Sequence, residues 1–212
     1  SGGGLKALAD GVLDLSLSAR ALKGTELEAG LEEKYCFATP LVFATQPENA
    51  ADVPLSRLND IYASPSPYWP NGVPLKVIMR TRSGSEHPYL AGKIEGLEKS
   101  FALARSRPDV VLGMTDQQNL DIAEKMFGAF AITTMLQIAT EKRKIVPVSV
   151  DGVQPGPDTL ADSTYPFSMT VCVVGRKMIR GQDAPLLLEY LESDAGMKLV
   201  RDAGALPIGR HR

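Results

Sequence analysis

The sequence has little of what metal centres and nucleic-acid-binding proteins require. Its 212 residues include only two histidines, His87 and His211, which are too few and too far apart to suggest a metal site. The net charge is −2, and nothing in the chain is basic enough to follow a nucleic acid. We therefore expect no metal, no cofactor and no nucleic-acid partner.

Long apolar runs are also missing. No run approaches the ~20 residues of a membrane-spanning helix, and no signal peptide is visible at the start. The composition, 44% apolar and 23% charged, is typical of an ordinary globular protein. A chain of this length buries roughly 70% of its unfolded surface, so it needs no disulfide to form a core.

Cysteine is scarce as well. Cys36 and Cys172 each lie in an apolar, strand-like run with no second thiol or histidine nearby. Small apolar surroundings are the usual setting of structural cysteine, so we expect two buried free thiols, with a disulfide as the alternative. The redox compartment is then not decided.

Strand and helix patterns alternate along the chain. Thr115 with Gln118 is typical of a capping box that starts a helix, and Thr25 with Glu28 is interpreted in the same way. The run 129–134 is too short for its period to separate strand from helix. The alternation favours an α/β fold with mixed, mostly parallel sheet.

Two long extended runs, 35–45 and 165–174, bracket the middle of the chain. This arrangement suits a two-lobed protein in which the chain crosses between the lobes twice. We expect residues 1–45 and 166–212 to form lobe I and residues 46–165 to form lobe II.

The stretch 79–89 is organised as a strand, a turn and a helix. Apolar residues lead into Arg80 and Arg82, and the turn Ser83-Gly84-Ser85 precedes the expected helix. The first N–H groups of a helix lack intrahelical partners and attract an anion, and glycine lets the backbone approach it. Serine hydroxyls and a guanidinium add further donors, so the stretch predicts an oxyanion cradle.

The chain opens with a similar device, Ser1-Gly2-Gly3-Gly4, directly before the apolar-periodic residues 5–9. Arg20 follows the expected strand 12–18. We interpret Ser1, Gly2, Gly3 and Arg20 as the counterpart of the cradle, so that one oxyanion is held between two lobes.

Ordinary alternatives remain open for each feature. A serine-glycine-serine turn is more often a helix cap and loop, and Arg82 is more often a solvated surface charge. Arg80 directly follows an apolar strand and is the better candidate. A glycine-rich start such as Ser1–Gly4 also occurs at frayed termini.

The joint order of several motifs resembles the phosphate-binding solute receptors of ABC transporters. The resemblance covers nearly the whole chain, and it implies that the family's amino-terminal segment is missing from this sequence. Its residues are Ser1–Leu8, Asp14–Arg20, Leu55–Tyr62, Trp69–Gly72, Arg80 with Ser83–Ser85, Val150–Val153, Thr164–Pro166, Ser193–Gly196 and Gly204–Pro207.

The resemblance implies a type 2 periplasmic binding protein with two α/β lobes, two crossover strands and closure over the ligand. It implies a non-enzymatic, monomeric receptor in the periplasm or at the cell surface. Its partners are inorganic phosphate or a related oxyanion and an ABC permease. The ligand-binding positions carried over are Ser1, Gly2, Arg80, Ser83, Gly84 and Ser85.

One departure bears on the choice of anion. Receptors of this kind often carry an aspartate that accepts the proton of phosphate, but the matching position here is Ala19, followed by Arg20. Two alternatives stay open. One is an effector-sensing domain of a transcriptional regulator with the same fold. The other is a phosphoryl-transfer enzyme, although the glycine-lysine-hydroxyl signature of a P-loop is absent.

Overall fold

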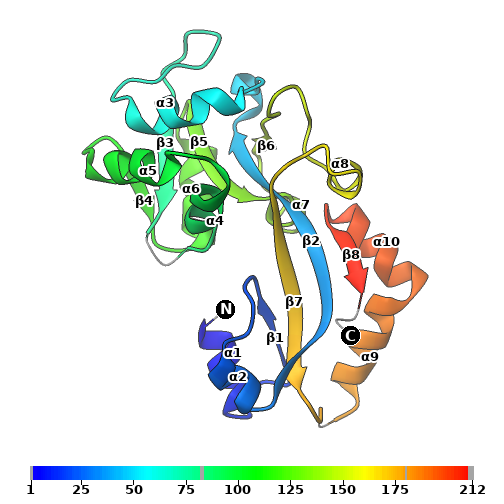
Figure 1. Ribbon diagram of the computed structural model, residues 1–212. Helices are drawn as coiled ribbons and strands as arrows, with labels where there is room; N and C mark the ends of the chain where they lie inside the picture. The colour runs from blue at the N-terminus through cyan, green and yellow to red at the C-terminus, as the bar shows by residue number, and fades with distance from the viewer. Residues whose placement is uncertain (1, 82–83, 180, 210–212) are drawn as a thin grey trace. The chain divides into compact units, whose positions relative to one another are not determined.

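The computed structural model describes residues 2–81, 84–179 and 181–209, and the chain divides into two units (Figure 1). Unit 1 comprises Ser1–Thr39 and Ser168–Arg212, and unit 2 comprises Pro40–Phe167. The strand β2 (Leu31–Thr45) contributes its first part to unit 1 and its last part to unit 2. That two such units act as lobes that close on a ligand stays a prediction.

Unit 1 is built from short helices and antiparallel strands. Besides β2, its elements are α1 (Gly2–Ala9), β1 (Leu15–Ser18), α2 (Gly24–Glu28), β7 (Ser168–Arg176), α9 (Asp183–Glu192), α10 (Asp194–Asp202) and β8 (Leu206–Gly209). Strand β1 pairs with β7, and β8 pairs with β2, in both cases antiparallel. Helix α1 ends before Gly11, whose φ of +78° lies in the left-handed region that favours glycine.

The capping box expected at Thr25 is wrong. Helix α2 begins two residues earlier than this capping box implies, with Lys23 in place of Thr25 as its N-cap. The carboxylate of Glu26 accepts a hydrogen bond from the Lys23 N–H at 2.8 Å and forms an ion pair with Arg20. Glu26 therefore takes the role that the sequence pattern assigned to Glu28.

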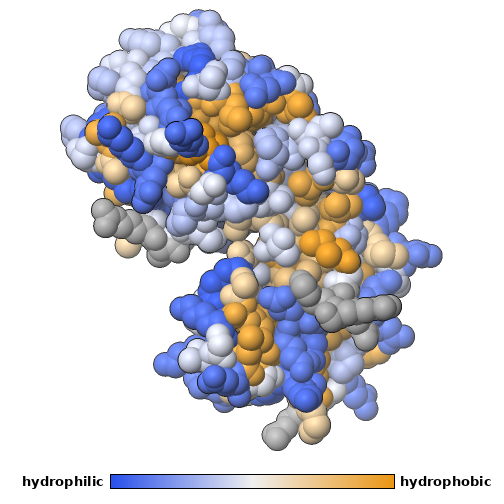
Figure 2. Space-filling model, viewed as in Figure 1, coloured by the Kyte–Doolittle hydropathy of each residue, from blue (hydrophilic) through white to orange (hydrophobic). Residues whose placement is uncertain are grey.

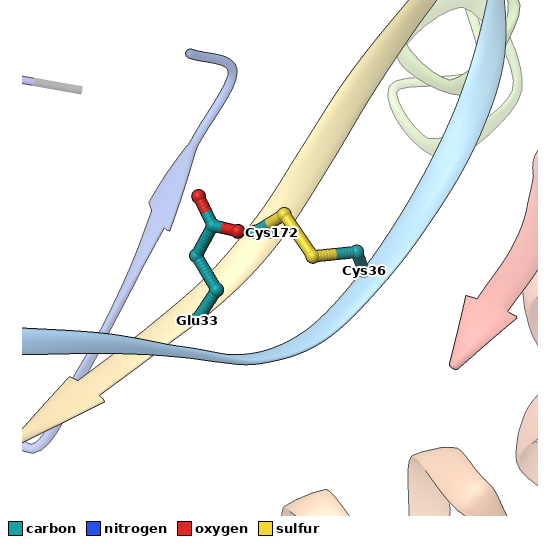
Figure 3. Close-up of side chains that lie close together, drawn as sticks. All are labelled: Glu33, Cys36 and Cys172. Atoms are coloured by element: carbon teal, nitrogen blue, oxygen red, sulfur yellow. A yellow bond between two sulfur atoms is a disulfide. The ribbon is translucent and has the colours of Figure 1, made fainter. Parts of the chain in front are cut away.

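The expectation of two free thiols is also wrong, because Cys36 of β2 and Cys172 of β7 form a disulfide (Figure 3). Both cysteines are buried, and a carboxylate oxygen of Glu33 lies within 4.8 Å of the sulfurs. Since the sulfurs are bonded to each other, neither offers a thiolate to a metal. The two cysteines are 136 residues apart, so only the adjacency of β2 and β7 brings them together.

Unit 2 contains the last part of β2 and the larger share of the helices. Its further elements are η1 (Pro47–Asn49), η2 (Leu55–Arg57), α3 (Leu58–Ala63), β3 (Lys76–Arg80), α4 (Glu86–Lys93), α5 (Leu97–Ser106), β4 (Val111–Gly113), α6 (Asp116–Lys125), β5 (Ala129–Thr134), α7 (Met135–Thr140), β6 (Val146–Pro147) and α8 (Pro157–Ala161). The run 129–134, ambiguous by period, is a strand because its apolar side chains are buried in the sheet.

The sheet of unit 2 is mixed. Strand β3 pairs in parallel with β4 and β5, whereas β2 pairs antiparallel with β5 and β6. The α/β class and the mixed sheet are confirmed. We expected mostly parallel pairing, but among the described strand pairs antiparallel ones are the more frequent. The parallel strands β5, β3 and β4 put the end of β3 at an edge where α/β proteins commonly bind ligands.

Polar side chains cover much of the face in Figure 2, and apolar side chains gather in smaller patches. In unit 1, Val12 is 75% exposed and Met178 is 79% exposed. Among the described residues, no helix is both long enough and apolar enough to cross a bilayer.

Candidate functional site

The predicted cradle connects β3 to α4 in unit 2 and lies at the carboxyl end of a parallel strand. Arg80, the last residue of β3, is opposite Gly113 of β4, and the N–H of Thr81 donates to the Gly113 carbonyl at 3.2 Å. The sheet therefore holds the entry to the turn. Arg82 and Ser83, two of the expected ligand residues, lie outside the described residues.

Arg80 is buried, with 8% of its surface exposed. Its guanidinium forms an ion pair with Asp116, the first residue of α6, while its Nε has no hydrogen-bond partner among the described residues. A guanidinium offers five N–H donors, and leaving one buried costs free energy. Arg80 therefore has donor capacity left for an acceptor that is not part of the described chain.

Glu86, the first residue of α4, places its carboxylate against Gly84. A Cβ at Gly84 would overlap the carboxylate of Glu86, so a larger residue at position 84 would require the Glu86 side chain to move. Glu86 is 8% exposed. Within the described part of the chain its Oε1 has no hydrogen bond, and the nearest charged or polar partner given is Nδ1 of His87 at 3.5 Å. The turn thus brings a buried carboxylate, rather than donors alone, to the cradle.

The charge state of Glu86 follows from its surroundings. Burial on its own would raise the pKa of Glu86. The imidazole of His87, the backbone N–H of Glu86 and the positive charge of Arg80 outweigh burial and leave the pKa below its ordinary value. Glu86 is therefore ionised near neutral pH and acts as an acceptor.

His87 completes the cluster from the second position of α4. It is 3% exposed, and its Nδ1 lies 3.5 Å from Oε1 of Glu86. Neither ring nitrogen forms a hydrogen bond with a described residue. The ring packs edge-on against Phe101 of α5 at 4.8 Å between centroids. His87 and Gly84 both line a cavity of about 660 Å³ between α4 and α5.

Four buried side-chain atoms without a hydrogen bond to a described residue therefore fall within eight residues of sequence. They are Nε of Arg80, Oε1 of Glu86 and both ring nitrogens of His87, and of these Oε1 and Nδ1 lie 3.5 Å apart. Nearly all buried polar atoms in native proteins are hydrogen-bonded, and a cluster of exceptions calls for a ligand, an ion or water. Here the unmet groups include both donors and an acceptor.

The backbone donors of the turn are partly used within the chain. The N–H of Gly84 donates to the Thr81 carbonyl at 3.2 Å, and Pro88 has no N–H to offer. Ser85 is exposed and precedes α4 without capping it through its side chain. The N–H groups at the start of α4 are thus fewer than the sequence pattern suggests.

The residues expected to face the anion from the other lobe, Ser1, Gly2, Gly3 and Arg20, belong to unit 1. Gly2 and Gly3 begin α1 and are exposed, whereas Ser1 lies outside the described residues. Arg20 follows β1, and its guanidinium makes two hydrogen bonds to Glu26, at 2.7 and 2.9 Å. The roles of Gly2, Gly3 and Arg20 as ligand residues stay predictions.

Sequence reasoning missed Glu86 and Asp116, and it found no partner for His87. The two acidic residues stand at the first positions of helices, where a carboxylate is ordinary because it complements the helix dipole. The available signal was their spacing from Arg80: one lies just past the turn, and the other follows a capping threonine, Thr115, after the next parallel strand.

No protein-family model matches the sequence, and no curated protein matches it either. Solved structures resemble it in fold. A candidate phosphate ABC transporter substrate-binding protein with bound phosphate from Clostridium perfringens has 18% identity and a TM-score of 0.76, over 98% of this chain and 84% of that one. An ABC-type phosphate transport receptor from Vibrio cholerae has 16% identity and a TM-score of 0.59, over 97% of this chain and 84% of that one.

A further match is the regulatory domain of MetR, a LysR family regulator from N. meningitidis. Its identity is 11% and its TM-score 0.51, over 96% of this chain and 79% of that one. At these identities the likeness shows the fold and not the ligand. The chain has the fold of the type 2 periplasmic binding proteins.

Proposed function

We propose that this chain is the solute-binding receptor of an ABC-type importer and that it binds a tetrahedral oxyanion, with phosphate as the favoured ligand. The observation that carries the proposal is the cluster at the end of β3 and the start of α4. Arg80, Glu86 and His87 are all more than nine-tenths buried, and each has a polar atom that forms no hydrogen bond with a described residue.

A small oxyanion fits this cluster chemically. Its oxygens accept hydrogen bonds from the Arg80 guanidinium, and hydrogen bonds to a charged group are among the stronger ones in proteins. The similarity to structures named as phosphate receptors supports the same ligand class. Binding, not catalysis, is the proposed activity, because these neighbours are named as binding proteins.

Location outside the cytoplasm is part of the proposal. The Cys36–Cys172 disulfide supports it, since disulfides persist in oxidising compartments such as the periplasm and are rare in cytosolic proteins. The second candidate, an effector-sensing regulatory domain, is favoured by the likeness to the MetR domain. A cytoplasmic regulator would normally keep its cysteines reduced, so the disulfide favours the receptor.

Titration calorimetry with phosphate, sulfate and molybdate tests the proposal directly. Heat is the more suitable signal, because Trp69 is 2% exposed in the core of unit 2 and donates to the Gly128 carbonyl. We expect saturable binding of phosphate. Absence of binding for all three anions at millimolar concentration would refute anion import as the function.

The variant Arg80→Met tests the role of the cradle. It removes the charged donor, so we expect the affinity for phosphate to fall by at least about tenfold, corresponding to roughly 1.5–3 kcal/mol. Arg57→Met is the matched control, because Arg57 is an exposed arginine of the same unit, outside the cradle. An unchanged affinity in Arg80→Met, with phosphate still bound, would place the site elsewhere.

A further inference from the structure

Helices α4 and α5 of unit 2 pack against each other (Figure 1). The cavity between them has a volume of about 660 Å³. Small-molecule sites are commonly clefts of about 300–1,000 Å³ that are lined mostly by apolar groups, with a few polar groups that fix the ligand's orientation. The cavity therefore has room for a small organic molecule, which is larger than an inorganic oxyanion.

Each helix contributes one face to the cavity. Residues three, four or seven positions apart lie on the same side of a helix. His87 and Ala91 of α4 have this spacing, and so do Glu98, Ala102 and Arg105 of α5. The two faces belong to helices that are joined by a short turn, so the cavity needs no residue of unit 1.

Two polar side chains meet at one aromatic ring in this cavity. The ring is that of Phe101, which is 2% exposed. The imidazole of His87 packs edge-on against it at 4.8 Å between centroids, and the guanidinium carbon of Arg105 lies over it at 5.9 Å from the centroid. The Phe101 ring thus holds the imidazole and the guanidinium near each other, both on the lining of the cavity.

His87 offers one of its two nitrogens to a ligand. Its Nδ1 lies 3.5 Å from the carboxylate of Glu86, whereas its Nε2 is buried and forms no hydrogen bond with a described residue. In the protonated ring both nitrogens are donors, which lets one point to Glu86 and the other to an acceptor in the cavity. Buried polar atoms of native proteins are nearly always hydrogen-bonded, so Nε2 calls for such a partner.

Charge differs between the two ends of the α5 face. Arg105 carries a guanidinium, and Glu98, seven residues earlier and about 10 Å away along the helix, carries a carboxylate. An anionic group gains charge-assisted hydrogen bonds at Arg105 and is repelled at Glu98. Ala91, Phe101 and Ala102 offer apolar surface to the rest of the ligand.

We propose that the cavity between α4 and α5 is a second ligand site, separate from the oxyanion cradle, and that it binds a small amphipathic carboxylate. The carboxylate of the ligand accepts from the Arg105 guanidinium and from Nε2 of His87. The apolar body of the ligand packs on Phe101, between Ala91 and Ala102. The site stands whether or not the cradle binds phosphate.

The test uses 3-phenylpropionate as the probe and 3-phenylpropionamide as its neutral isostere. Binding is followed by the backbone amide resonances of the whole chain in ¹⁵N-labelled protein. We expect saturable shifts that are largest in α4 and α5, with a dissociation constant on the order of 1 mM, as suits a ligand of this size. The neutral amide should bind at least about tenfold more weakly, because it lacks the charge that Arg105 recognises.

Arg105→Met tests the recognition of charge. It removes the guanidinium, so we expect the acid-to-amide affinity ratio to fall at least about tenfold. Arg57→Met is the matched control, because Arg57 is an exposed arginine of unit 2 outside the cavity, and it should keep the wild-type ratio. A folded Arg105→Met protein that keeps the wild-type ratio would overturn the proposal.

Ala102→Trp tests the location and decides the matter if Arg105→Met does not fold. Ala102 is exposed on α5, so a tryptophan there fills the cavity without entering the core, and we expect the affinity for the probe to fall at least about tenfold. Leu103→Trp places the same ring at the neighbouring position, which is 45% exposed and outside the cavity, and should leave the affinity unchanged.

Two further results would overturn the second site. One is the absence of saturable shifts in α4 and α5 of the wild-type protein. The other is displacement of the probe by inorganic phosphate, because competition would mean that the acid occupies the oxyanion cradle. Probe binding that persists in the presence of phosphate is the expected result.

Discussion

Unit 1 and unit 2 bury their apolar residues in different ways. Unit 2 is organised around an aromatic cluster, in which Phe130 of β5 stacks on Phe43 of β2 at 5.1 Å and meets Trp69 edge-on at 5.7 Å. The buried cluster of unit 1 is aliphatic, with Leu5 and Leu8 of α1 packed near the disulfide. Buried aromatic pairs are concentrated in unit 2, with Tyr35 and Phe37 as the pair of unit 1, and the disulfide lies in unit 1.

The two units also differ in how many large apolar side chains they expose. Unit 1 is the smaller unit, yet large apolar side chains with high exposure are more numerous in it than in unit 2. They are Val12, Leu13, Leu17, Leu27, Met178, Leu186, Leu187, Tyr190, Met197, Leu199 and Ile208 in unit 1, against Tyr68, Leu103, Leu112, Met114 and Phe127 in unit 2. A small core gains less free energy from burying apolar surface than a large one. A disulfide therefore contributes a larger share of the stability in a small unit.

This difference bears on the candidate site. The cradle directly follows β3, in which Val77, Ile78 and Met79 are each no more than 2% exposed. The backbone at Arg80 is therefore held by a packed core. A binding group on such an element is preorganised, and less entropy is lost when the ligand binds. The stability of unit 2 and anion binding should therefore change together.

The largest expected effect is on the aromatic core. Phe130→Ala removes a fully buried ring that contacts Phe43, Tyr62 and Trp69. We expect unit 2 to lose about 3–5 kcal/mol of unfolding free energy, because the lost packing leaves a cavity. Hydrogen exchange of β3 and β5 amides, compared with β1 and β7 amides, measures the effect in each unit.

Phe127→Ala is the control for that variant. Phe127 lies three positions earlier and is 64% exposed, so its removal should change stability by no more than about 0.5 kcal/mol. An equal loss of protection in both units of Phe130→Ala would show that the units unfold as one, and the contrast between them would have no thermodynamic meaning.

The secondary structure was predictable where the signals are local. Gly11 ends α1 in a left-handed conformation, and Thr115 caps α6 by accepting from the Gln118 N–H at 3.0 Å. Both depend only on neighbours in the chain. The capping box at Thr25 failed because Lys23, and not Thr25, is the N-cap. Glu26 at the third helical position accepts from the Lys23 N–H and forms an ion pair with Arg20, which lies six residues earlier.

The parts that were not predictable depend on contacts between distant segments. The disulfide needs β2 beside β7, which neither cysteine reveals in sequence. In the candidate site, Arg80 and Gly84 were predicted from the sequence because both belong to one local pattern, a strand followed by a turn and a helix. Glu86 was not, because its significance comes from burial and from an unpaired oxygen, which no sequence pattern records.

The second prediction concerns the covalent link in unit 1. The loop closed by Cys36 and Cys172 contains all of unit 2. While unit 2 is folded, its ends are already joined, since the Leu41 N–H donates to the Phe167 carbonyl at 3.1 Å. The effective loop is then short, and Cys36→Ala with Cys172→Ala should destabilise unit 1 by about 3 kcal/mol, the value for about 15 residues, instead of nearly 5 for a loop above 100.

Denaturant titration of the double variant, followed by hydrogen exchange in β1 and β7, measures this cost. The amides of β3 and β5 serve as the internal control and should keep their protection. A cost near 5 kcal/mol that appears in both units would mean that unit 2 does not stay folded when unit 1 opens.

The smallest expected change in stability is at the ion pair between Arg20 and Glu26, near the start of α2. The hydrogen bonds from Arg20 and from the Lys23 N–H lower the pKa of Glu26 from 4.5 to about 2. Its side chain is 18% exposed and that of Arg20 is 29% exposed, so solvent screens the pair and Glu26→Gln should cost unit 1 less than about 1 kcal/mol at neutral pH. Glu28→Gln, an exposed carboxylate of the same helix, is the matched control.

The pH dependence gives this last prediction its sign. Because the folded pKa of Glu26 lies below the unfolded one, the contribution is fully present above about pH 4.5 and is lost as the pH falls toward about 2. The stability difference between wild-type protein and Glu26→Gln should therefore shrink through that window, as measured by denaturant titration at several pH values. A difference that stays constant down to pH 2.5 would show that packing, and not the charge of Glu26, holds the loop of Arg20 against α2.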